Sequence, residues 1–233
     1  MSTATAGTER RGGLEEVGRV RRGVHSRGLA GTLLVGAAAI ARLAYLREAQ
    51  VWYCLDVRGE MPVSSVPPGI EVRRAREHDL HLVEQLPLVG TRVARRRLSR
   101  GAELWVAQRG TTLAFSCWVF RETSPARAIR GGWLQLPPGT VALEEVATAV
   151  AFRGRSIAST ALAVIVRSLA ETGVQAVVTK LDETNLPCRR AIERVGFRAV
   201  ASMQLVRIGG RARVALHAHE DVAAGFLIAQ VPR

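Results

Sequence analysis

Short runs of alternating or continuous hydrophobic residues recur along the chain, separated by runs in which hydrophobic residues repeat with helical spacing. The first pattern predicts strands, at residues 51–57, 70–75, 103–120 (a hairpin), a run ending near 150, 175–181 and 199–219 (a second hairpin). The second pattern predicts helices, at residues 77–86, 91–101, 153–173 and 186–196. This order predicts a mixed α/β fold whose sheet is not purely parallel.

The composition changes along the chain and divides it into three parts. Residues 1–27 hold six arginines and little apolar periodicity, which predicts a disordered basic N-terminus. Residues 28–66 hold an apolar segment, a strand and a linker, and the paired prolines that begin at Pro67 mark the boundary. Residues 67–233 form the predicted domain.

The apolar segment, residues 28–46, has several interpretations. Its uncharged part ends before Arg42 and is shorter than the roughly 20 residues that span a bilayer, so we do not expect a spanning helix. We favour a helix that packs on the domain. A helix lying on a membrane surface is the first alternative. A secretory signal and a tunnel for a long acyl chain are the others.

Length and composition indicate a folded, cationic protein. The 233 residues are 48% hydrophobic, which provides a sizeable core and excludes global disorder. The net charge of +13 favours anionic partners such as nucleic acid, anionic lipid or a phosphorylated small molecule. Aromatic residues are only 5% and do not interleave with the arginines, so we consider nucleic acid unlikely. The arginine run within 91–101 is either a solvated helix face or the entrance to an anion site.

The cysteines and late histidines indicate neither a disulfide framework nor a metal site. Cys54, Cys117 and Cys188 are odd in number and widely spaced, which is typical of a reducing compartment, and we expect a cytoplasmic protein. Packing is the expected role of Cys188, with acyl-enzyme chemistry as the alternative. His217 and His219 would share a strand face, but no third ligand is suggested, so we expect no metal.

A candidate phosphate site lies at residues 153–158, RGRSIA, where a strand gives way to a helix. The start of a helix leaves backbone N–H groups without partners and carries the positive end of the helix dipole. Small residues in this turn leave the approach to those amides open, and its two arginines add charge and forked donors. Alone, the turn is a weak signal.

A second motif strengthens this interpretation. Asn185 follows Arg153 by 32 residues and opens a helix that ends in Gly196-Phe197. The two motifs together resemble the GNAT acyltransferase superfamily, whose signature is a Q/R-x-x-G-x-G/A turn, a strand, and an Asn-led helix closing in Gly-Phe. The resemblance is carried by residues 141–206 and, with 70–75 as first strand, extends over 70–215.

The resemblance implies a mostly antiparallel sheet in which two parallel strands, 141–148 and 176–181, splay apart at a bulge and admit the pantetheine arm of acetyl-CoA or another acyl-CoA. By the family pattern, the Val146 amide would hold the thioester oxygen. The resemblance assigns coenzyme contacts to Val146, Thr148, Arg153, Gly154, Arg155, Ser156, Ile157, Ala158 and Asn185.

A carboxylate beside the bulge commonly acts as the base in this family. Glu144 and Glu145 are adjacent, so on a regular strand they would point to opposite faces, and we prefer Glu145 by register. The chain departs from the family at two positions. Ser156 stands where glycine is usual, and Ile192 stands where many members carry the tyrosine that protonates the leaving thiolate.

We therefore expect an N-acyltransferase that moves an acyl group from CoA to a primary amine of a small molecule, such as an amino sugar or another metabolite, with a protein amine as second choice. The loops at 77–100 and 121–138 would select the acceptor. A binding-only relative without turnover and a basic nucleic-acid-binding protein are the alternatives. Contact between 28–46 and a membrane surface, and a homodimer, are left open.

Overall fold

The computed structural model describes residues 45–59, 65–86, 89–209, 211–219 and 221–231. The disorder expected for residues 1–27 and the helix expected from residue 28 lie outside the described residues. Tyr45 and Leu46, assigned above to the end of the apolar segment, are instead the first residues of a strand.

The sheet has eight strands in the order β10-β9-β1-β8-β7-β4-β3-β2, and a separate two-stranded sheet pairs β5 with β6. The strands are β1 (Tyr45–Asp56), β2 (Glu71–Arg74), β3 (Glu103–Arg109), β4 (Thr112–Phe120), β5 (Thr123–Pro125), β6 (Trp133–Gln135), β7 (Thr140–Thr148), β8 (Ala176–Asp182), β9 (Arg198–Ile208) and β10 (Arg211–Ala218). Neighbours in the large sheet pair antiparallel except β7 and β8, which are parallel. The mixed α/β fold with a mostly antiparallel sheet is confirmed.

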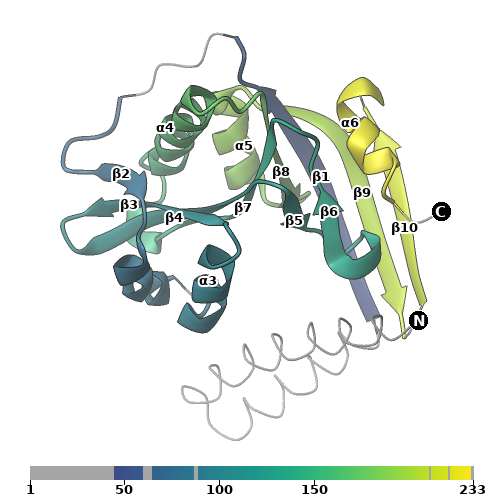
Figure 1. The fold of residues 1–233 in the computed structure, drawn as a ribbon, viewed down its shortest axis with the longest axis horizontal. Helices are drawn as coiled ribbons and strands as arrows, with labels where there is room; N and C mark the ends of the chain where they lie inside the picture. The colour runs from purple at the N-terminus through teal and green to yellow at the C-terminus, as the bar shows by residue number, and fades with distance from the viewer. Residues whose placement is uncertain (1–44, 60–64, 87–88, 210, 220, 232–233) are drawn as a thin grey trace, which may run out of the picture.

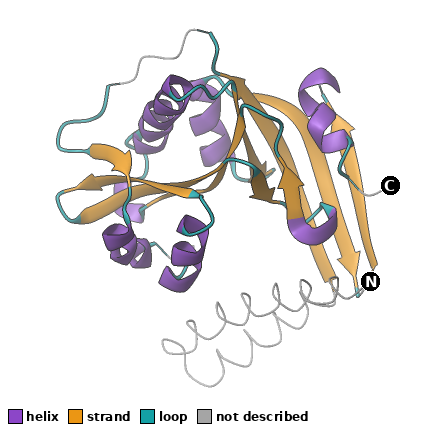
Figure 2. Ribbon diagram, in the orientation of Figure 1, coloured by secondary structure: helices purple, strands orange, loops and turns teal. Residues whose placement is uncertain are grey.

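Helices cover both faces of the sheet (Figures 1 and 2). The helical segments are η2 (Glu77–Gln85), α3 (Thr91–Leu98), η3 (Arg130–Gly132), η4 (Val150–Phe152), α4 (Ile157–Glu171), α5 (Leu186–Val195) and α6 (Asp221–Ile228). One face packs against α4 and α5 around Leu162 and Ile192. The other packs against η2 and α3 around Leu104 and Trp118. A third cluster joins α6 and the β5–β6 hairpin to Trp52 of β1.

Strand β1 lies in the interior of the sheet, between β8 and β9. Trp52 is paired with Lys180 on one side and with Ala201 on the other. The strand expected at 51–57 is therefore longer than predicted and belongs to the same sheet as the strands after Pro67. Its hydrophobic residues explain the position, because a strand covered on both faces must bury both of its side-chain rows.

The remaining expected elements are confirmed, and the structure contains further elements. The hairpin predicted at 103–120 turns at Gly110, and α4 and α5 are followed by Gly173 and Gly196 in left-handed conformations that suit glycine. The helix expected at 77–86 is a 3-10 helix. The sequence analysis did not anticipate the β5–β6 hairpin or α6.

Candidate functional site

The parallel strands β7 and β8 separate halfway along their length. They pair from Thr140 and Ala176 as far as Leu143 and Thr179, where the Thr179 hydroxyl donates a 2.8 Å hydrogen bond to the Leu143 carbonyl. Beyond this point β7 continues beside β4 and β8 continues beside β1. The main-chain groups of β7 and β8 that face each other beyond the split are left without strand partners, as an extended ligand would require.

A β-bulge lies in β7 directly after the split. Ser116 pairs with Ala147 and Trp118 with Glu144, so Glu145 and Val146 together stand opposite Cys117. Glu145 adopts a left-handed backbone with φ of 51°, which is unfavourable for a residue with a side chain. Such strain persists only where the surrounding structure imposes it.

The bulge changes the direction of the two carboxylates. Glu144 stands directly across from Trp118, and Arg97 of α3 lies over the Trp118 ring while it pairs with Glu145. Both carboxylates therefore lie on the face of the sheet that carries Trp118 and α3. The expectation that Glu144 and Glu145 point to opposite faces is wrong, because the left-handed residue interrupts the alternation of the strand.

Glu144 is buried beneath the β5–β6 hairpin. Ser124 of β5 donates a 2.6 Å hydrogen bond to its Oε1, and the Lys180 ammonium of β8 pairs with the same oxygen. Lys180 also donates to the Pro125 carbonyl at 2.6 Å and lies 5.2 Å from the centroid of the Trp52 ring. These contacts bridge both sides of the split and hold the hairpin over Glu144.

Glu145 is more open, and it forms a two-pronged ion pair with Arg97. The Arg97 Nη1 and Nη2 atoms lie 2.7 and 2.9 Å from the two carboxylate oxygens. The guanidinium stacks 5.2 Å above the Trp118 ring and 5.6 Å above the Phe120 ring. The side chain of Glu145 is 32% exposed, against 10% for Glu144. A ligand can therefore approach Glu145 more readily than Glu144.

The turn before α4 has the open form expected of an anion site. Gly154 and Ser156 both have left-handed backbones, with φ of 73° and 57°, and no side chain caps the helix. No atom lies within 4 Å of the position that a Gly154 Cβ would take. Residues 153–156, directly before α4, are exposed, as an anion site at a helix N-terminus requires. Arg153 uses its Nε to donate to the Thr148 carbonyl at 3.3 Å.

Helix α5 begins on the β8 side of the split. Asn185 caps it, because its Oδ1 accepts a 3.3 Å hydrogen bond from the Cys188 amide. Ile192 is fully buried in the α4–α5 core. Burial raises the pKa of the Cys188 thiol, which keeps it protonated and unreactive and agrees with a packing role.

The structure adds three site residues that the sequence analysis did not identify as such: Arg97, Ser124 and Lys180. One signal was present, because Lys180 is the single lysine of the chain and follows a run of buried strand residues. Nothing in the sequence distinguishes Arg97 from its arginine neighbours. His217 lies on β10 and His219 directly follows it, away from the split, and the described residues contain no group of three potential metal ligands.

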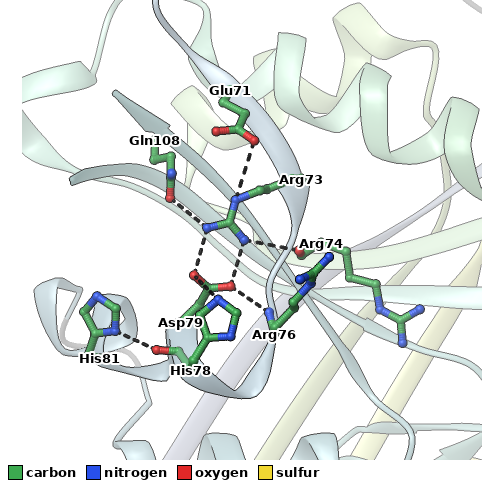
Figure 3. A network of polar contacts seen from close by, with 8 residues as sticks. All are labelled: Glu71, Arg73, Arg74, Arg76, His78, Asp79, His81 and Gln108. Atoms are coloured by element: carbon green, nitrogen blue, oxygen red, sulfur yellow. Dashed lines mark hydrogen bonds and ion pairs between the residues drawn. The ribbon is translucent and has the colours of Figure 1, made fainter. Parts of the chain in front are cut away.

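A basic hollow of about 300 Å³ lies at the edge strand β2, separated from β7 by two strands. Arg73, Arg74, Arg76 and His78 line it. Figure 3 shows that the Arg73 guanidinium pairs with the Asp79 carboxylate. The two contacts measure 2.7 and 2.8 Å, and the Arg76 backbone amide donates to the same carboxylate. The Arg73 guanidinium holds the pKa of Asp79 well below its usual value. The network fixes η2 against the sheet.

Residues 87–197 match the model of the acetyltransferase (GNAT) family, which confirms the resemblance inferred from the two sequence motifs. The match contains α3, the split, the turn before α4 and α5. No curated protein matches the chain. None of the described helices has both the length and the apolar character needed to cross a membrane.

Three solved structures illustrate the likeness of fold. A Drosophila protein shares 16% identity over 77% of this chain and 58% of its own, with a TM-score of 0.51. A putative GNAT-family acetyltransferase from Novosphingobium aromaticivorans shares 19% identity over 75% of this chain and 68% of its own, with a TM-score of 0.49. A GCN5-related N-acetyltransferase from Sphaerobacter thermophilus shares 18% identity over 79% of this chain and 55% of its own, with a TM-score of 0.49. The chain thus spans between 55% and 68% of these proteins.

Proposed function

We propose that the protein binds acyl-CoA in the split between β7 and β8 and transfers the acyl group to a primary amine of a small molecule. The observation that carries the proposal is the split itself: parallel pairing ends at Leu143 and Thr179, directly before the bulge at Glu145 and Val146. The family match over residues 87–197 supports it.

The donor would lie along β7, with its phosphates at the turn before α4. Gly154 and Ser156 leave the helix amides accessible, and Arg153 and Arg155 add positive charge. The pantetheine arm would add as a strand beside Val146 and Thr148, and Asn185 would contact it from the α5 side. The Val146 amide would stabilise negative charge on the thioester oxygen.

The acceptor would approach from the α3 face, where Glu145 is the accessible carboxylate. The Arg97 fork holds both Glu145 oxygens, so an amine that binds this carboxylate takes the place of the fork. Glu145 would orient the amine and remove its proton as the amine attacks the thioester. Glu144, buried with Lys180, would shape the site and take no proton.

The departing thiolate receives no proton from Ile192, which is apolar and fully buried. It would leave into water or take the proton that the amine releases. The same residue favours the second candidate, a protein that binds CoA without turnover.

The test is release of free thiol from acetyl-CoA in the presence of a panel of primary amines. Wild-type protein should release thiol with at least one acceptor, and Glu145→Gln should slow release by about 10²-fold or more while it still binds CoA. CoA binding without thiol release from any amine would support the binding-only candidate. Retention on RNA that collapses as salt rises, without CoA binding, would support a nucleic-acid-binding protein.

A further inference from the structure

Arg97 is placed differently from the other arginines of its helix. Among the five arginines in residues 92–100, the other four are exposed, whereas the Arg97 side chain is 16% exposed and points toward the sheet. It lies between the rings of Trp118 and Phe120 and the carboxylate of Glu145. The proposed acceptor face therefore presents a positive and a negative group side by side.

The two aromatic rings hold Arg97 in place independently of Glu145. A guanidinium stacked on aromatic faces keeps its planar donors pointing outward, and cation–π contacts of this kind stabilise a desolvated cation. If an acceptor occupies Glu145, Arg97 can remain on its aromatic support and bind a second anionic group. A flexible ammonium without such support would not be fixed in this way.

Charge matching then limits which amines can enter. An amine alone would take Glu145 and leave the half-buried Arg97 cation without its counter-ion, beside a second positive charge. Removing the counter-ion of a partly desolvated cation is unfavourable. An acceptor that carries a carboxylate next to its amine avoids this cost, because its ammonium replaces Arg97 on Glu145 and its carboxylate replaces Glu145 on Arg97.

Lys180, the cation paired with the adjacent Glu144, does not offer an alternative site for the carboxylate. The Lys180 ammonium already contacts Glu144, the Pro125 carbonyl and the Trp52 ring, and its side chain is only 11% exposed. Arg97 has a planar fork that matches the geometry of a carboxylate. Recognition of the acceptor therefore falls to the pair Arg97 and Glu145.

We infer that the acceptor is an amino acid or a similar small zwitterion, with its carboxylate bound by Arg97 and its amine by Glu145. This inference rests on the proposed acyl transfer from CoA. Acylation of an amino acid balances as follows: the ammonium loses one proton to Glu145, the free amine attacks the thioester carbon, the C–S bond breaks, and the amine's second proton passes to the thiolate. The products are an N-acyl amino acid and CoA.

The experiment compares matched acceptors that differ only in the carboxylate. We would measure kcat/KM with acetyl-CoA for glycine against glycinamide and for phenylalanine against phenylalaninamide. The amides have less basic amines and are more often unprotonated at neutral pH, so basicity favours them. Wild-type protein should nevertheless prefer the amino acids by at least about tenfold, because a site with an unpaired polar group rejects the analogue that lacks its partner.

Two variants of helix α3 test whether Arg97 causes the preference for amino acids over their amides. Arg97→Gln should abolish it, chiefly by raising KM for the amino acids, whereas Arg96→Gln, which removes an exposed arginine, should retain it. Equal kcat/KM for amino acids and amides in the wild type would overturn the inference, as would a preference that survives in Arg97→Gln. If Arg97→Gln does not fold, as judged by circular dichroism, the wild-type comparison decides alone.

Failure of the proposed function gives a different result. If CoA binds but no acceptor is acylated, catalysis is absent, and the inference is tested by calorimetry with the protein–CoA complex. Phenylalanine should bind that complex and phenylalaninamide should not. Equal binding, or binding of neither, would overturn the zwitterion inference.

Discussion

Thr179 donates a side-chain hydrogen bond to the carbonyl oxygen of Leu143, and these are the last two residues at which β7 and β8 pair. The bond links the strands at the vertex of the split. At Glu145 and Val146 β7 bulges, while β8 remains beside β1. The interior position of β1 supports this geometry, because β1 pairs with all of β8 and so stabilises the part of β8 that has no partner in β7.

The turn before α4 gives a first prediction about backbone strain. Ser156 has φ of 57°, a conformation that costs a residue with a side chain roughly 1 kcal/mol. Ser156→Gly should therefore raise the free energy of unfolding by up to about 1 kcal/mol, measured by urea denaturation. Ser159→Gly, in the first turn of the same helix, should lower it by a similar amount.

The opposite ranking of these two variants would contradict the backbone conformation assigned to Ser156. CoA affinity provides a second check. Ser156→Gly should bind CoA at least as well as the wild type, because no side chain then remains at that position to crowd the phosphates.

The two adjacent carboxylates should differ in their contribution to stability. Glu144→Gln leaves the buried Lys180 ammonium without its counter-ion and should cost about 3 kcal/mol of unfolding free energy. Glu145→Gln should cost about 1 kcal/mol, because this side chain is 32% exposed. The double variant Glu144→Met/Lys180→Met should recover most of the loss. Equal costs for the two single variants would show that the hairpin does not seal Glu144 as described.

The Arg73–Asp79 pair gives a prediction about pH. Hydrogen bonds from Arg73 are the main cause that lowers the pKa of Asp79, so the folded state favours the charged carboxylate. This stabilisation is present above the unfolded pKa of about 3.9 and is lost as the pH falls below it. Asp79→Asn should cost about 3 kcal/mol at pH 7, and the difference from the wild type should shrink on acidification toward pH 3.

Glu71→Gln is the matched control for this pair. Glu71 faces the same guanidinium at 3.7 Å but its side chain is 63% exposed, so its loss should cost less than about 1 kcal/mol. The measurement is urea denaturation at several pH values. A difference between wild type and Asp79→Asn that stays constant with pH would contradict the lowered pKa.

Tyr53 joins β1 to α5 on the face opposite the carboxylates. Its hydroxyl accepts a 2.8 Å hydrogen bond from Arg189 and donates one of 3.2 Å to Glu193, and burial raises its pKa. Tyr53→Phe should lower the free energy of unfolding by about 1 kcal/mol and leave thiol release unchanged. Loss of turnover at unchanged stability would instead assign the hydroxyl a part in the chemistry.

Local patterns account for most of what could be predicted from the sequence. The alternation in residues 103–120 gave the hairpin around Gly110, and the glycines after α4 and α5 gave the ends of both helices. The turn at 153–158 and the Asn185 helix lie where the resemblance placed them, and the split is present. These features depend on short-range periodicity and on glycine backbone conformations, which a sequence displays directly.

Long-range pairing accounts for what could not be predicted. Nothing in residues 45–56 indicates insertion between β8 and β9, because strand composition specifies burial and not the neighbour. The positive φ of Glu145 reverses a side-chain direction that regular alternation predicts. Arg97 lies in a run of similar arginines, and only the fold distinguishes the one that meets Glu145.

The most direct test of the central claim is calorimetric titration of the full chain with CoA. We expect saturable binding at a single site. Ser156→Glu, which places a negative charge at the exposed turn before α4, should weaken it at least about tenfold, since an anion at a helix N-terminus is repelled by added negative charge. Gln204→Glu, the same kind of change on an exposed position of β9, should bind as the wild type does. No binding of CoA by the wild type, or equal affinity in Ser156→Glu, would contradict a coenzyme site at the split.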